Sequence, residues 1–160
     1  MHEGSAVVGD ETPEAVTAAL LTASRLLMAI SARSIASVDD SITIPQLRAL
    51  VILANEGPVN LATLAGLLGV QPSTTGRMVD RLVSAGLIAR RPHPRSRREL
   101  IAELTPRGRD VVNEVTRKRR REITVIVDRM PSLQRRGLVR ALDAFAAAGG
   151  ELPDRISDAS

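Results

Sequence analysis

Residues 61–98 constrain the fold more than any other stretch, because they combine two short amphipathic segments, a turn and a run of arginines. The first segment follows Asn60, a residue type that caps helices, and its apolar side chains recur every three or four positions. Gly69 can end this helix, since glycine adopts the left-handed conformation without a Cβ penalty, and Pro72 suits the first turn of a second helix. The pattern predicts a helix, a turn and a second helix.

The second predicted helix, residues 72–85, separates an apolar stripe from a polar face. The stripe consists of Thr75, Met78, Val79, Leu82 and Val83. The polar face carries hydroxyl and guanidinium groups, which can donate hydrogen bonds to base edges and phosphates. A helix-turn-helix presents its second helix to the major groove in this way. We therefore predict DNA contacts from this helix by Ser73, Thr74, Thr75, Arg77 and Arg81.

A basic hairpin is predicted directly after these helices. Residues 87–91 and 100–104 have the pattern of short strands, and the loop between them is rich in proline and arginine. No acid occurs between Arg90 and Glu99, so the tip of the hairpin concentrates positive charge, which suits a phosphate backbone. We predict a winged helix whose wing contacts DNA through Arg90, Arg91, Arg95, Arg97 and Arg98.

Long amphipathic helices are predicted on both sides of the winged helix. Residues 12–39 start with a Thr-Pro pair, and so do residues 105–130. Their apolar surface exceeds what a winged helix, which closes its own core, can cover. Either these helices fold back on the same chain or a second copy covers them, and we favour the second copy. The side chains expected at that dimer interface are Val16, Leu20, Leu27, Leu138, Leu142 and Phe145.

The predicted fold class is mainly α (α+β). A winged helix-turn-helix domain with a small β-hairpin occupies residues 42–105, between dimerisation helices at 12–39 and 106–150. Flexible tails are expected at residues 1–11 and 151–160.

Composition excludes several classes of function. The chain has no cysteine, which excludes disulfides and thiolate metal sites, and His2 and His93 are far apart in sequence. Phe145 is the only aromatic side chain, so stacking on single-stranded bases is excluded. No nucleophile adjoins a histidine and no glycine-rich phosphate loop is present. We expect no enzyme, no cofactor and no metal.

The same sequence predicts a cytoplasmic protein without a membrane partner. We expect no apolar run near the roughly 20 residues that a bilayer span needs. The first residues lack the basic-then-apolar pattern of a signal peptide.

Residues 41–108 resemble the MarR family of bacterial transcription regulators. The segments that carry the resemblance are, in chain order, SITIPQLRAL, LATLAGLLGVQPSTTGRMVDRL, GLIARRPHPRSRR and LTPRG. The resemblance implies that residues 72–85 are the recognition helix and that Arg98 is the wing arginine inserted into the minor groove. The chain departs from the family at Ser96, which replaces an aspartate that commonly pairs with that arginine, and at Gly76, which replaces a frequent serine or threonine.

The resemblance also implies a function: a homodimeric, sequence-specific repressor that binds double-stranded DNA at an imperfect palindrome. Relatives often respond to small aromatic acids bound where the dimer helices meet the winged domain. The residues expected to form such an effector pocket are Leu26, Ile30, Arg33 and Arg48. The alternative for these two arginines is simple solvent exposure. The alternative for the whole chain is a winged-helix protein-interaction module without DNA binding.

Overall fold

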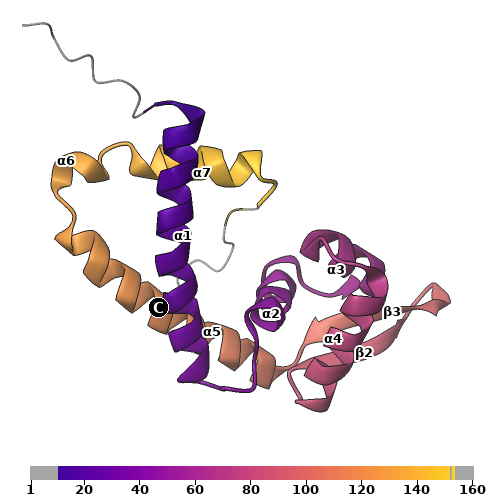
Figure 1. Cartoon of the computed structure of the whole chain (residues 1–160). Helices are drawn as coiled ribbons and strands as arrows, with labels where there is room; N and C mark the ends of the chain where they lie inside the picture. The colour runs from indigo at the N-terminus through magenta and orange to yellow at the C-terminus, as the bar shows by residue number, and fades with distance from the viewer. Residues whose placement is uncertain (1–10, 152, 154–160) are drawn as a thin grey trace, which may run out of the picture.

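The computed structural model describes residues 11–151 and residue 153. Two long helices, α1 and α5, pack against each other, and the winged helix lies beside their lower ends with its hairpin projecting away from them (Figure 1). The elements are α1 (Pro13–Ala36), α2 (Ile44–Glu56), β1 (Val59–Asn60), α3 (Leu61–Leu68), α4 (Pro72–Ser84), β2 (Ile88–His93), β3 (Ser96–Leu104), α5 (Pro106–Arg129), α6 (Ser132–Arg135) and α7 (Leu138–Ala148).

Local capping interactions determine where the helices of the winged domain begin and end. At the start of α2 the Thr43 hydroxyl accepts a hydrogen bond from the Gln46 N–H at 3.2 Å, and the Gln46 side chain accepts one from the Thr43 N–H at 3.0 Å. The Asn60 side chain caps α3 by accepting from the Thr63 N–H at 2.7 Å. Gly69 ends α3 with a φ of 67°, the left-handed conformation that its sequence position predicted.

The turn between α1 and α2 is closed by one carboxylate. Ser41 donates two hydrogen bonds to Asp39, from its hydroxyl at 2.6 Å and from its backbone N–H at 3.0 Å. These bonds hold the pKa of Asp39 below its ordinary value, because they stabilise the ionised carboxylate. The turn therefore directs the chain from the long helix into the winged domain.

The sheet has three antiparallel strands in the order β1-β3-β2. Ile88 pairs with Leu104 at the base of the hairpin, and Val59 pairs with Ala102 on the other side of β3. The hairpin strands are longer than the sequence pattern predicted, and β1 was not predicted because it has only two residues. The register shifts between Pro92 and His93, near the tip.

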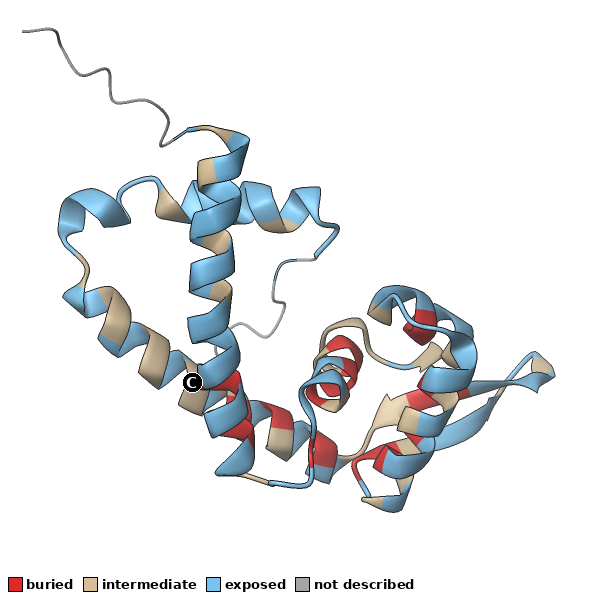
Figure 2. Cartoon of the chain, viewed as in Figure 1, coloured by how far each residue is buried: buried red, intermediate tan, exposed pale blue. Residues whose placement is uncertain are grey.

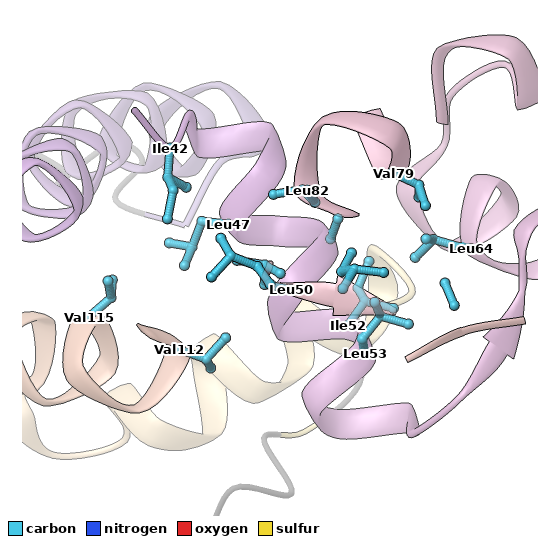
Figure 3. Packing of buried hydrophobic residues seen from close by; sticks show 14 of the residues in the cluster. Ile42, Leu47, Leu50, Ile52, Leu53, Leu64, Val79, Leu82, Val112 and Val115 are labelled. Carbon is cyan, nitrogen blue, oxygen red and sulfur yellow. The ribbon is translucent and has the colours of Figure 1, made fainter. Parts of the chain in front are cut away.

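The core lies between the winged helix and the lower halves of the two long helices (Figures 2 and 3). Leu50, Leu64 and Leu82, from three helices of the winged domain, are buried within it. Val112 and Val115 of α5 belong to the same cluster. The expectation that a winged helix closes its own core is therefore wrong here, because α5 supplies part of that core.

The last helical part of the chain is divided in two. Arg136 is extended and Gly137 has a φ of 75°, so α6 and α7 are separate helices. The upper part of α1 and nearly all of α7 are exposed in the single chain (Figure 2).

The helix α1 also corrects the expectation about membrane spans. It has 24 residues and a window of mean hydropathy 1.6, so it is long and apolar enough to cross a bilayer by length and composition. A single such helix near the N-terminus is weak evidence, because helices of soluble proteins pass the same test.

Candidate nucleic-acid interface

The helix α4 exposes a polar and mostly cationic face. Pro72 occupies its first position, and Val79 and Leu82 anchor its inner face in the core. Its exposed polar and charged side chains are Ser73, Thr74, Arg77, Asp80, Arg81 and Ser84. Four of the five residues predicted as DNA contacts on this helix, all except Thr75, are thus available to a partner outside the chain.

Thr75 is the exception. Its side chain is fully buried at 0% exposure, and its hydroxyl has no hydrogen-bond partner among the described residues. The prediction that Thr75 contacts DNA is therefore wrong. Its spacing of four from Val79 and seven from Leu82 already placed it on the inner stripe, and that signal outweighs its polar side chain.

Two of the five predicted wing arginines form ion pairs inside the protein. Arg90 Nη1 lies 2.5 Å from Asp80 Oδ1, so the first strand of the wing is joined to α4. Arg91 Nε lies 3.4 Å from Glu103 Oε1 on the neighbouring strand. Sequence reasoning missed both acidic partners, although Asp80 stands out as an acid between Arg77 and Arg81 on the exposed face of α4.

The other three wing arginines, Arg95, Arg97 and Arg98, are exposed. Within the described part of the chain no carboxylate forms an ion pair with them. The turn at the tip is held by His93 Nδ1, which accepts a hydrogen bond from the Arg95 N–H at 3.0 Å. Ser96 pairs with His93 in the hairpin and, unlike an aspartate, supplies no charge to hold Arg98.

The predicted effector residues differ in exposure and in partners. Ile30 is fully buried, whereas Leu26 is 45% exposed. Arg33 pairs with Glu122 of α5 at 2.7 Å. Arg48 pairs with Glu151, which follows α7, at 3.1 Å. The two guanidinium groups thus engage different elements rather than a shared site.

The residues predicted for a dimer interface leave apolar surface uncovered. Val16, Leu27, Leu142 and Phe145 are 44%, 45%, 47% and 57% exposed. Leu20 and Leu138 are half-buried. Large apolar side chains are thus left uncovered on both α1 and α7.

Comparison with known proteins identifies the family. The MarR family model matches residues 42–100. The HTH-type transcriptional regulator Mb0904 of Mycobacterium bovis is 30% identical over 115 residues, which are 70% of this chain and 78% of that protein. The chain belongs to the MarR family. This MarR protein is a DNA-binding transcriptional regulator with a winged helix-turn-helix, as its residues predicted.

Solved structures agree with this MarR fold. The crystal structure of RV1404 from Mycobacterium tuberculosis shares 67% sequence identity with this chain and has a TM-score of 0.83. The match covers 92% of this chain and 100% of the RV1404 chain. FabT from Streptococcus pneumoniae, solved in complex with DNA, has a TM-score of 0.74 over 87% of this chain and 98% of its own. At 17% identity FabT supports the fold alone.

The relatives also bear on the broad class of function. The curated relatives are transcriptional regulators rather than enzymes. A winged-helix interaction module without DNA binding is not supported, because the matched family consists of DNA-binding regulators and the exposed face of α4 is charged rather than apolar.

Proposed function

We propose that this MarR regulator acts in the cytoplasm as a homodimeric repressor that binds an imperfect palindrome in double-stranded DNA. The observation that carries the proposal is a set of exposed guanidinium groups that form no ion pair with any residue the structure describes. On α4 these are Arg77 and Arg81, and on the wing they are Arg95, Arg97 and Arg98. In the proposal α4 enters the major groove and the wing arginines contact phosphates and the minor groove.

A two-fold symmetric dimer accounts for the exposed apolar faces of α1 and α7. Phe145 and Leu142 lie on α7 and would be buried against the partner's outer helices. A dimer of this kind presents two copies of α4 to successive major grooves, about 10 base pairs apart. The operator should therefore be an inverted repeat with that half-site spacing.

Release by a small aromatic acid stays a prediction. Arg33 and Arg48 are the cations available for a carboxylate, but each would first have to give up its present partner, Glu122 or Glu151. The proposal of a repressor does not depend on an effector.

Selection of binding sites from random-sequence duplex DNA, with the full chain, tests the DNA part of the proposal. We expect enrichment of an inverted repeat, protection of two adjacent major grooves, and two chains bound per duplex. Affinity should fall steeply as salt rises, because phosphate contacts release counterions. Failure to enrich any sequence would overturn the proposal of sequence-specific binding.

A reporter gene tests the direction of regulation. With the selected operator placed across the promoter, expression of the full chain should lower transcription, and disrupting one half-site should restore it. Increased transcription from the intact operator would identify an activator instead.

A further inference from the structure

We infer that Asp80 is a positioning residue, which holds the wing at a fixed angle to the recognition helix by pairing with Arg90. In this role Arg90 belongs to the joint between helix and wing and does not contact DNA. The inference rests on the proposed function, because it assumes that α4 and the wing bind one duplex together. It departs from the sequence prediction, in which Arg90 was a DNA contact.

The base of the wing is held by the turn from α4, by the pairing of Val59 with Ala102 and by the burial of Ile88 in the core. The turn from α4 into β2 consists of residues 85–87, with Gly86 at a φ of 76°. Two hydrogen bonds close it, from the Gly86 N–H to the Val83 carbonyl at 2.9 Å and from the Leu87 N–H to the Leu82 carbonyl at 3.0 Å. From Pro92 to Leu100 the strands of the wing pair only with each other, so this outer part of the hairpin can tilt about its base.

The ion pair adds a direct attachment between the wing and the side of α4. Asp80 lies more than one helical turn before the end of α4, and Arg90 is the third residue of β2. Their contact of 2.5 Å joins the side of the helix to the rising strand. Together with the base of the wing, this contact sets the angle at which the free arginines of the tip are held relative to the recognition helix.

The charge of Asp80 makes the direction of the change in DNA affinity a test of its role. Asp80 carries a negative charge beside Arg77 and Arg81, on the face proposed to meet phosphates. A carboxylate with no structural role there would repel DNA, so neutralising it would tighten binding. If Asp80 positions the wing, neutralising it weakens binding instead. The two roles predict opposite changes in affinity.

A second ion pair of the wing offers a matched control. Arg91 and Glu103 lie on the two strands of the same hairpin, so their contact cannot set the angle between the hairpin and α4. Neutralising Glu103 removes one negative charge from the wing, as neutralising Asp80 removes one from the helix, but it leaves the joint intact.

The test measures the affinity of full-length variants for the operator recovered by selection, at one fixed salt concentration. Asp80 and Arg90 are 57% and 34% exposed, so the effect should be modest. We expect Asp80→Asn to weaken binding about two- to fivefold, within the range of exposed ion pairs. Glu103→Gln should leave affinity unchanged or raise it slightly. Asp80→Glu should recover part of the loss.

A double-mutant cycle and a footprint separate positioning from direct contact. Arg90→Gln should cost about as much as Asp80→Asn, and the double variant should cost no more than either, because both remove the same joint. Hydroxyl-radical protection by the wing should weaken in each variant while protection by α4 persists. Unchanged thermal melting of the variants would separate this effect from a loss of folding.

Two outcomes overturn the inference alone while the wild-type chain binds its operator. One is tighter binding by Asp80→Asn. The other is a loss in Arg90→Gln that adds to the effect of Asp80→Asn, which would make Arg90 a direct phosphate contact. A wild-type chain that binds no duplex would overturn the proposed function and this inference with it.

Discussion

A Cβ atom built on Gly108 would lie 2.1 Å from the backbone carbonyl oxygen of Leu87, which is closer than side-chain atoms can approach a carbonyl. This contact brings the first turn of α5 against the residue that precedes β2. Thr105 reinforces it, since its hydroxyl donates to the Gly86 carbonyl at 2.6 Å and accepts from the Gly108 N–H at 3.0 Å. The outer helices are thus joined to the winged domain at a point that tolerates no side chain.

We predict that Gly108→Ala destabilises the protein. The added methyl group must push α5 away from the backbone at Leu87, and overpacking of this kind costs about 1–3 kcal/mol. The free energy of unfolding, measured in urea, reports the loss. Gly66→Ala on α3 is the control, because nothing lies within 4 Å of a Cβ at Gly66 and the change should stabilise the helix by roughly 0.5–1 kcal/mol. Equal stability of the two variants would contradict the prediction.

The sequence was sufficient where structure depends on neighbouring residues. Proline and hydroxyl or amide caps located the starts of α1, α3, α4 and α5, and Gly69 located the end of α3, because these signals act within a few positions. The inner stripe of α4 was likewise readable from periodicity. Thr75 was wrongly predicted to contact DNA because its polar side chain was given more weight than this periodicity, which places it on the buried face.

The sequence was insufficient where structure depends on packing between distant segments. The close approach of Gly108 to Leu87 and the Asp80–Arg90 pair depend on the angle at which elements meet, which no local pattern encodes. The ion pair between Arg33 of α1 and Glu122 of α5 likewise depends on how two distant helices pack, so the sequence predicted Arg33 to be available to an acid.

The proposed recognition helix and the wing should respond differently to loss of an arginine. Arg77→Ala should change the sequence selected from random DNA, because a bidentate contact with a base discriminates by roughly 1–3 kcal/mol. Arg98→Ala should weaken binding to specific and nonspecific DNA alike and lower the salt slope by about one unit per lost phosphate contact. Parallel site selections and salt titrations measure both effects. An unchanged consensus for Arg77→Ala would contradict the assignment of α4.

The proposed dimer should depend on the exposed face of α7. Phe145→Glu places a charge where we propose an apolar contact, and burial of such a side chain is worth roughly 1.5–3 kcal/mol per copy. Because two-fold symmetry repeats the loss, the dimer dissociation constant should rise at least about a hundredfold. Light scattering over a range of concentrations measures it. Val70→Glu, at an exposed apolar position after α3, should stay dimeric, and dimeric Phe145→Glu would contradict the proposed interface.

An effector acid, if the predicted response exists, must compete with a carboxylate of the protein. Glu122 lies 2.7 Å from Arg33, so Glu122→Gln should free the guanidinium and increase the thermal shift caused by a salicylate-like acid. Arg33→Ala should abolish the shift. The absence of any shift at millimolar acid in the wild type and in Glu122→Gln would contradict an acid site at Arg33.

Gly76 provides the most direct measure of how closely α4 approaches DNA. It lies inside the helix, and nothing in the protein lies within 4 Å of a Cβ built there, so no contact within the protein accounts for a glycine that costs about 0.5–1 kcal/mol relative to alanine. Gly76→Ala should therefore raise the free energy of unfolding about as much as Gly66→Ala does. Operator binding should change little in Gly76→Ala, because the resemblance to the MarR family implies that a serine or threonine side chain is accommodated at this position. Gly76→Ser should bind the operator more tightly than Gly76→Ala, because its hydroxyl can donate a hydrogen bond to a base edge or a phosphate. The ratio of operator affinities between these two variants isolates that hydroxyl contact. A Gly76→Ser variant that binds no more tightly than Gly76→Ala would mean that α4 holds this position away from the DNA.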